Sequence, residues 1–256
     1  MRSPIIHGYT TMVREETTRL FRIWSQTLLP PVVTNTLYYV IFGAFIGSQV
    51  ADIDGFSYMA YIVPGLVMMT IITSSYMNTV STFFFAKFQK HIEEMLVSPM
   101  PSWVVVAGFV TGGVIRGMLV GFLVLLVSLF FTHLVIYNAF IIFGAAILTS
   151  VVFALAGLVN GMFAKSFDAI SIVPTFVLTP LTYLGGVFYS VEMLPPFWQQ
   201  LSLLNPILYM VNAFRYGFLG VSDVPLTTSF AVMGAFIIVF LVAVLWFFKK
   251  GAGLKN

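Results

Sequence analysis

The chain has 256 residues, of which 59% are hydrophobic and only 8% are charged. Because charged residues make up about a quarter of an ordinary water-soluble domain, this composition excludes that class and indicates an all-α polytopic membrane protein. The net charge of +3 does not indicate a nucleic-acid partner, since in a membrane protein the placement of basic residues matters more than their sum. The chain has no cysteine, which excludes disulfides, thiolate nucleophiles and cysteine-based metal sites.

Residues 12–27 form the first predicted element, an amphipathic helix on the membrane surface. At about 100° per residue, one arc holds Val13, Thr17, Leu20, Phe21, Trp24 and Leu28. The opposite arc holds Arg14, Glu15, Thr18, Arg19, Arg22 and Gln26. We expect the apolar arc to face lipid, with the arginines near anionic headgroups. The alternative is a solvated leader ahead of the first span.

Six apolar stretches are then predicted to cross the membrane, in keeping with the roughly 20 residues that a spanning helix needs. They are residues 29–50, 58–82, 103–131, 139–164, 169–188 and 229–248. Asn78 lies in the second span beside several hydroxyl residues. Such groups either hydrogen-bond across helices or contact a translocated substrate, and the sequence favours the first interpretation.

Residues 83–101, between the second and third spans, predict a short two-faced helix ended by Pro99 and Pro101. One face carries Phe84, Phe88, Ile92, Met95 and Leu96, and the other carries Lys87, Lys90, Glu93 and Glu94. A mixed-charge amphipathic helix of this kind can dock into a groove on a soluble partner. The alternative is a loop that rests among lipid headgroups.

The third span combines a stripe of small residues with a charge. Gly113, Gly117 and Gly121 recur every four residues and predict close approach of another helix. Arg116 lies about 20 Å along the helix from Trp103, a depth at which a charge is costly and normally faces a cavity or a carboxylate. We therefore treat it as a candidate functional residue, with a structural ion pair or snorkelling as the alternative; its partner is not evident.

Residues 179–217 stay apolar but are broken at short intervals. The breakers are Pro180, Gly185, Gly186, Pro195, Pro196, Asn205 and Pro206. The intervening pieces are too short to cross a bilayer, and irregular backbone is tolerated at membrane depth only where protein or a water-filled cavity covers it. The segment is therefore predicted to form re-entrant half-helices between the fifth and sixth spans.

The basic residues set the orientation. With six crossings and a cytoplasmic N-terminus, ten of the twelve Lys and Arg residues fall inside. These are Arg2, Arg14, Arg19, Arg22, Lys87, Lys90, Lys165, Lys249, Lys250 and Lys255. Arg116 is then intramembrane and Arg215 outside. The positive-inside rule thus predicts two cytoplasmic termini and places residues 179–217 at the outer face.

One ordered motif in this broken segment resembles the permease subunit of ABC-2 type transporters. The matching residues are Pro180, Gly185, Gly186, Phe188, Leu194, Pro195, Gln199, Leu201, Ser202, Asn205, Pro206, Tyr209, Asn212 and Arg215. The similarity extends over nearly the whole chain and is to small permeases of the bacterial cytoplasmic membrane, encoded apart from their ATPase. It implies a single ABC-2 (type V exporter-like) domain over residues 1–256.

The resemblance also implies roles and partners. The loop at 83–101 becomes a coupling helix that meets two copies of an ABC ATPase, through Lys87, Lys90, His91, Glu93, Glu94 and Met95. The chain is expected to pair with a second copy in the lipid membrane and to export an amphipathic, lipid-like, drug-like or glycan substrate. Arg116 and Asn78 are assigned to the translocation path, and residues 179–217 to an outer exit gate. ATP and Mg²⁺ are assigned to the partner chain. No cofactor is expected on this chain.

Motifs for catalysis are missing from the sequence. There is no G-x-x-x-x-G-K-[ST] for nucleotide phosphates and no G-x-S-x-G. His7, His91 and His133 stand far apart in the sequence, which argues against a histidine metal site. An integral membrane enzyme is therefore disfavoured. An ATPase-independent channel or secondary carrier stays the alternative, although such proteins normally use more intramembrane charges than the one seen here.

Overall fold

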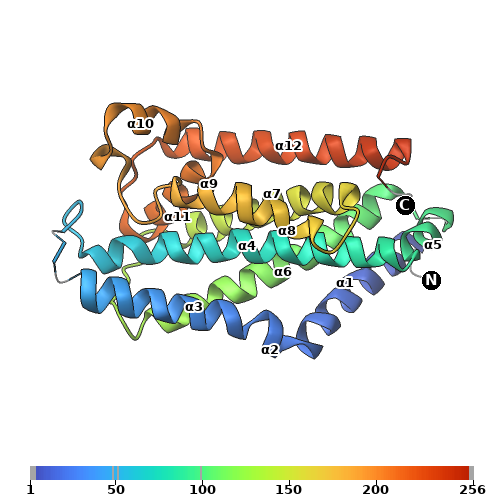
Figure 1. The fold of residues 1–256 in the computed structure, drawn as a ribbon, viewed down its shortest axis with the longest axis horizontal. Coiled ribbons are helices and arrows are strands. Elements are labelled where there is room, and N and C mark those ends of the chain that lie inside the picture. Colours follow the sequence, from blue (N-terminus) through green and yellow to red (C-terminus); the bar gives the residue numbers. More distant parts are fainter. Residues whose placement is uncertain (1–3, 48, 51, 99, 254–256) are drawn as a thin grey trace.

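The computed structural model describes residues 4–47, 49–50, 52–98 and 100–253, which are almost entirely helical (Figure 1). The first part holds α1 (Pro4–Arg22), α2 (Trp24–Thr27), α3 (Leu29–Tyr39), the π-helix η1 (Val40–Ile46), α4 (Tyr58–Phe88), α5 (His91–Val97) and α6 (Ser102–Ser128). The second part holds α7 (Ala139–Phe163), α8 (Ala169–Val173), the π-helix η2 (Pro174–Leu178), α9 (Thr179–Tyr183), the 3-10 helix η3 (Val191–Met193), α10 (Pro196–Leu203), α11 (Pro206–Leu219) and α12 (Leu226–Lys250). Arg2, Lys255 and Pro99, used above for orientation and for a helix end, lie outside the described residues.

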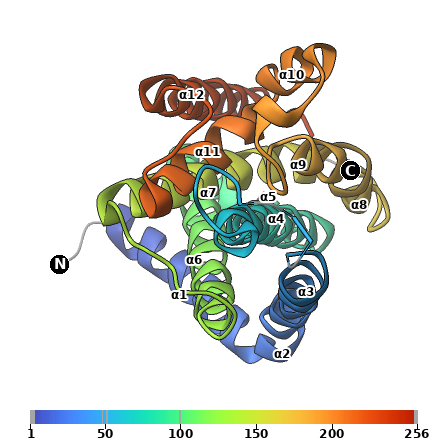
Figure 2. The ribbon, with the colours of Figure 1, turned by 90° about the vertical axis from the view of Figure 1, so that its left-hand side faces the viewer.

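Helix α4 is the centre of the bundle. The most apolar 18-residue window of α4 is 89% buried, whereas the equivalent window of α12 is 11% buried. Figure 2 shows α3, α6, α7 and α8 arranged around α4, with α12 at the periphery. A helix that is apolar on all sides must be surrounded by protein or by lipid, so α4 forms the protein core and α12 offers its surface to lipid.

Glycines allow the other long helices to approach α4. A side chain at Gly117 of α6 would collide with Ser75 Oγ, and one at Gly121 would lie 2.5 Å from Ile71. On α7, a Cβ at Gly157 would lie 2.6 Å from the Tyr76 carbonyl oxygen. The glycine stripe predicted on the third span is therefore confirmed as a helix-packing surface.

The predicted count of six spans is not confirmed. In the described residues, α4, α6, α7 and α12 are long and apolar enough to cross a membrane. The first predicted span, at 29–50, is divided into α3 and η1. The fifth, at 169–188, is divided into α8, η2 and α9 and ends at Tyr183.

Proline explains the break in the fifth predicted span. Pro174 has no N–H to donate to the carbonyl oxygen of Ile170, four residues earlier. The chain continues from Pro174 as a π-helix, and the Ile170 oxygen accepts a hydrogen bond from Asn160 Nδ2 of α7 at 3.3 Å instead. A buried carbonyl needs such a partner, so Asn160 ties α8 to α7.

The two ends of the long axis carry different parts of the chain. Helix α5, the start of α1 and the end of α12 lie at one end, and α10 and the turn after η1 lie at the other (Figure 1). This arrangement agrees with the predicted side of the coupling loop relative to the broken segment. The assignment of the α5 end to the cytoplasm stays a prediction from the placement of basic residues.

Candidate functional site

The predicted coupling helix is in fact two helices. α4 continues to Phe88, and Lys90, with a φ of 62°, turns the chain into α5. This separates Phe84, Lys87 and Phe88 from the helix that the sequence predicted for them. Within α5, Ile92 is 1% exposed and seats the helix against the bundle. His91, Glu93 and Glu94 are exposed and Met95 is half-buried, while Lys90 is exposed just before the helix.

Lys87 does not share that exposed face. Its side chain is buried, and Nζ donates hydrogen bonds to the carbonyl oxygens of Met162 at 2.7 Å and Ala164 at 3.2 Å. Both oxygens lie at the C-terminal end of α7, where unpaired carbonyl groups and the helix dipole attract a cation. Lys87 therefore fastens the end of α4 to the end of α7, and its ammonium is not available to a docking protein.

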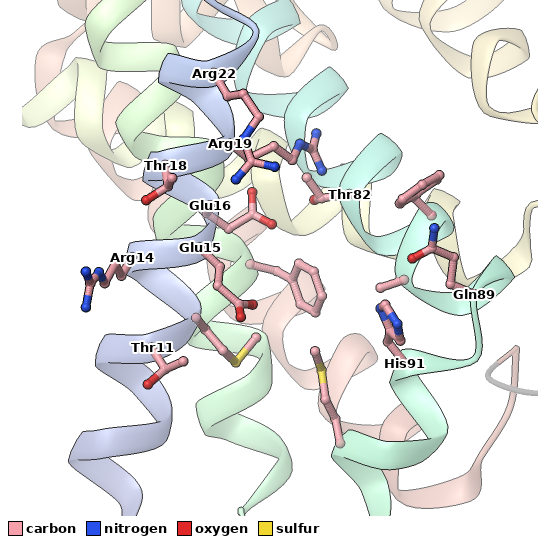
Figure 3. Close-up of a pocket in the computed structure, with 15 residues that line it drawn as sticks. Thr11, Arg14, Glu15, Glu16, Thr18, Arg19, Arg22, Thr82, Gln89 and His91 are labelled. Atoms are coloured by element: carbon pink, nitrogen blue, oxygen red, sulfur yellow. The ribbon is translucent and has the colours of Figure 1, made fainter.

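A charged cleft of about 630 Å³ lies beside α5 (Figure 3). Helix α1 forms one wall, and Gln89 and His91 line the opposite wall (Figure 3). The charged side chains on the α1 wall are Arg14, Glu15, Glu16, Arg19 and Arg22. Three of the arginines predicted to meet lipid headgroups thus line a cleft that continues onto the exposed face of α5.

Helix α1 is longer and oriented differently from the predicted interfacial helix. It begins at Pro4 and ends at Arg22, and Trp24 starts the separate helix α2 with its ring 56% exposed. A stripe of residues beside the predicted apolar arc packs on α6: Tyr9 bonds to Thr111 Oγ1 at 2.9 Å, and Met12 covers Gly108. The predicted apolar arc therefore faces the protein in part and the surroundings in part, because Leu20 is buried and Phe21 is exposed.

Glu16 joins this stripe and faces the membrane-depth arginine. A Cβ at Gly112 would lie 2.9 Å from the Glu16 side chain, and Asn78 Nδ2 donates to Glu16 Oε2 at 3.3 Å. Burial raises the pKa of the Glu16 carboxyl, and the opposing effects of Arg19, the Asn78 hydrogen bond and Arg116 do not reverse that shift. Of the predicted residues, Asn78 thus hydrogen-bonds the Glu16 carboxylate, and Arg116 lies near enough to interact with it electrostatically.

Sequence reasoning missed Glu16 as the acidic partner of Arg116. The usable signal was Gly108 and Gly112, spaced four apart on α6, which mark a second helix-packing stripe. Arg116 Nε itself has no hydrogen-bond partner among the described residues. Its interaction with Glu16 is therefore electrostatic at a distance.

At the other end of the bundle, the predicted breakers start helices or form turns. Pro180 lies in the first turn of α9, Pro195 precedes α10, and Pro206 begins α11. Gly186 has a φ of 69°, a conformation that glycine adopts without strain, and a Cβ at Gly185 would lie 2.8 Å from Ile207.

Asn205 connects two of these pieces. Its Oδ1 accepts from the Ile207 backbone N–H at 3.0 Å, and its Nδ2 donates to the Leu181 carbonyl oxygen at 2.6 Å. The asparagine therefore caps α11 and binds α9 to it. Helix α11 has 14 residues, too few to cross a bilayer; the re-entrant arrangement stays a prediction.

Arg215, which the sequence predicts on the outer side of the membrane, is the hub of this end, and its side chain is buried. Arg215 is 1% exposed. Nη2 donates to the Gly186 carbonyl oxygen at 2.6 Å and Nε donates to that of Tyr61 at 3.3 Å. The guanidinium also lies 4.0 Å from the centre of the Tyr61 ring. One side chain of α11 thus holds the start of α4 and the turn after α9.

Aromatic rings fill the space between η1 and α9. Phe188 stacks on Tyr183 at 5.7 Å and contacts Phe42 at 5.1 Å between ring centres. Tyr38 meets Phe188 edge-on at 6.4 Å. Phe42 therefore places the π-helix η1 beside this cluster, and π-helical turns are frequent at functional sites.

The chain is similar to proteins of a known family. The family described as ABC-2 type transporter matches residues 7–219. The chain is 57% identical to the inner membrane transport permease YadH of Escherichia coli strain K12, over 94% of each protein. A permease of the same name in Shigella flexneri is equally similar. Nodulation protein J of Rhizobium leguminosarum bv. viciae is 27% identical over 79% of this chain and 80% of that protein.

The apolar helices and these relatives together indicate an integral inner-membrane transport permease. The match covers α1 to α11, including the charged cleft, the Glu16 cluster and the Arg215 hub. The family is that of membrane subunits that work with an ABC ATPase, in accord with the absence of a nucleotide-binding motif from this sequence. The chain therefore belongs to the ABC-2 type transporter family.

Proposed function

We propose that the chain is the permease subunit of an ATP-driven exporter and that the exposed face of α5, with the adjoining cleft, receives the ATPase. The supporting observation is that Ile92 is the one buried residue of α5, whereas His91, Glu93 and Glu94 are exposed. Val97 at its end is 87% exposed. A short helix that buries one residue and offers charged and apolar groups outward suits docking of a soluble protein.

The neighbouring contacts give a route from that face to the membrane helices. Lys87 fastens the end of α4 to α7, and α1 reaches α6 and α4 through Met12 and Glu16. A shift of α5 would thus be passed to three helices by packed and hydrogen-bonded groups, since closely packed elements transmit displacement. ATP and Mg²⁺ are assigned to the partner.

A second copy of the chain would complete the path. Leu37 of α3 is 57% exposed and Phe176 of η2 is 74% exposed, and these helices flank α4 on the same side (Figure 2). Apolar surfaces beside a core helix can serve as an interface between copies. Cysteines at Leu37 and Phe176 should then cross-link two copies, whereas a cysteine at Val239 on the outer surface of α12 should not.

The transported substrate is proposed to be amphipathic, because the surfaces beside α4 combine aliphatic and aromatic groups with few polar ones. Export requires an outward exit, for which the residues from Pro180 to Arg215 at the end opposite α5 are the candidate. A cysteine at the exposed Glu192 should react with a membrane-impermeant thiol reagent in intact cells, since the natural chain has no cysteine. Reaction only after permeabilisation would reverse the orientation.

The docking face is tested by charge reversal at Glu94. The permease is co-expressed with its cognate ABC ATPase, purified in detergent, and assayed for retained ATPase and for ATP-dependent transport. Glu94→Lys should weaken retention of the ATPase roughly tenfold. The positive charge on the ATPase that complements Glu94 would then face a lysine and be repelled by it. Glu192→Lys, at the opposite end and also exposed, is the matched control.

Two results would contradict the proposal. Equal ATPase retention by the Glu94→Lys and Glu192→Lys variants would remove α5 from the interface. Vanadate-insensitive transport by the purified chain alone would instead support the rival function, an ATPase-independent carrier.

A further inference from the structure

An apolar groove of about 410 Å³ lies away from the charged cleft. It is lined by α4, α7, α11, α12 and the consecutive helices α8, η2 and α9. Val152 and Ala156 of α7 form its floor, and Phe236 and Phe240 of α12 form one side. Its volume is within the roughly 300–1,000 Å³ of small-molecule sites. None of the contacts described above for ATPase docking uses this groove.

The groove opens sideways, on the apolar surface of the bundle. Phe163 and Val177 line it and are 49% and 46% exposed, respectively. Pro174 and the π-helix after it keep this segment from continuing as a regular helix, and Asn160 ties α8 to α7 at one end. The mouth therefore faces the hydrocarbon that surrounds spanning helices, and a bilayer lipid reaches it without crossing water.

The length of the groove matches one leaflet of a membrane. On α7 its lining runs from Val152 to Phe163, which corresponds to about 16 Å at 1.5 Å per residue. The hydrocarbon core of a bilayer is about 30 Å thick, so each leaflet contributes about 15 Å. A single acyl chain lying parallel to α7 therefore fits the available length.

One end of the groove carries a weakly satisfied polar group. Tyr76 lines the groove and is 1% exposed, and its hydroxyl makes no hydrogen bond of regular geometry among the described residues. The Asn160 side chain lies close to this hydroxyl, but its Nδ2 is committed to the Ile170 carbonyl oxygen, so only Oδ1 is left as an acceptor. A buried hydroxyl without a well-aligned acceptor is unfavourable, and an ester carbonyl would supply one.

We propose that this groove binds one acyl chain of a membrane phospholipid, with its ester carbonyl accepting a hydrogen bond from the Tyr76 hydroxyl. The chain then extends from Phe163 towards Val152, between α7 and α12. The lipid enters from the leaflet at the α5 end, because Asn160, the polar neighbour of the Tyr76 hydroxyl, lies near the end of α7 that Lys87 contacts. The site is independent of the exporter proposal and requires neither ATP nor a cargo.

Photo-crosslinking in liposomes tests the position and direction of the lipid. The full-length protein is reconstituted with ester-linked phosphatidylglycerol that carries a diazirine either next to the ester or at the end of one acyl chain. The first probe should label peptides around Phe163, and the second should label peptides around Val152 and Phe240. The reverse pattern would overturn the assignment of Tyr76 as the polar end.

A groove-filling variant tests occupancy. Ala156→Trp should reduce labelling about tenfold because the indole occupies the space of the acyl chain. Ile147→Trp, on the exposed side of the same helix, should leave labelling unchanged. Equal labelling in both variants, with both shown to be folded by size-exclusion chromatography and thermal unfolding, would overturn the proposal.

Tyr76→Phe keeps the ring and removes the hydroxyl, so it gives a test that does not depend on filling the groove. The wild-type protein should be labelled about fivefold more by the ester-linked probe than by its ether-linked analogue, in proportion to one hydrogen bond. Tyr76→Phe should abolish that preference. An unchanged preference, or labelling by a free fatty acid carrying the diazirine and not by the phospholipid, would overturn the assignment of a phospholipid ester.

Discussion

At the α5 end of the bundle, charged side chains of α1 line a cleft. The neighbouring helix α5 carries further exposed charges and is held by Ile92 and a turn at Lys90. At the opposite end, Arg215 is buried and donates to backbone oxygens of two separate segments. The first arrangement is easily displaced by a partner, whereas the second resists displacement. The difference suggests that motion enters at one end and meets a rigid frame at the other.

The largest effect is expected when that frame is broken. Arg215→Leu removes the donor of the Gly186 carbonyl oxygen and the side-chain donor of the Tyr61 carbonyl oxygen. Because a hydrogen bond to a charged group contributes about 1.5–3 kcal/mol, the free energy of unfolding should fall by roughly 3–5 kcal/mol. Thermal unfolding in detergent measures this change. The control is Arg22→Leu, since Arg22 is exposed at the end of α1, and similar stability of the two variants would contradict the role given to Arg215.

The same contrast explains what the sequence could predict. The helix breakers between Pro180 and Pro206 and the glycine stripe of α6 follow from local rules, because proline, glycine and small-residue spacing act through the backbone. The fates of Lys87 and Arg215 do not. Lys87 was assigned to a docking face and Arg215 to the outer gate, but each is buried against carbonyl oxygens supplied by segments far away in the chain.

Glu16 and the number of spans were missed for related reasons. A carboxylate in an amphipathic helix is interpreted as a solvated group unless the glycine that receives it is recognised, here Gly112 of α6. Apolar length predicted the spans, but length alone does not reveal where a π-helix will divide one, as Pro174 does. These outcomes depend on tertiary contacts that composition does not encode.

An intermediate effect is expected at the junction between the two ends. Lys87→Met removes the donor from the Met162 and Ala164 carbonyl oxygens and should destabilise the protein by about 2 kcal/mol. If α4 passes motion to α7 there, ATP-driven transport should fall more than ATPase binding does. Lys90→Met is the matched control, because Lys90 is exposed and its side chain should contribute less than about 0.5 kcal/mol. Equal loss of transport in both variants would exclude a special role for the Lys87 contact.

The smallest effect is a pH dependence from Glu16. Because burial raises the pKa of this carboxyl in the folded protein above its ordinary value of 4.5, the folded state holds the proton more tightly than the unfolded state does. The free energy of unfolding should therefore decrease as the pH rises from 4.5 through the raised pKa. Glu16→Gln cannot ionise and should flatten this part of the stability profile, measured by thermal unfolding across that range. Glu15→Gln changes an exposed neighbour and should keep the wild-type slope; if Glu16→Gln also keeps it, the carboxylate that Asn78 and Arg116 share is not the group that titrates.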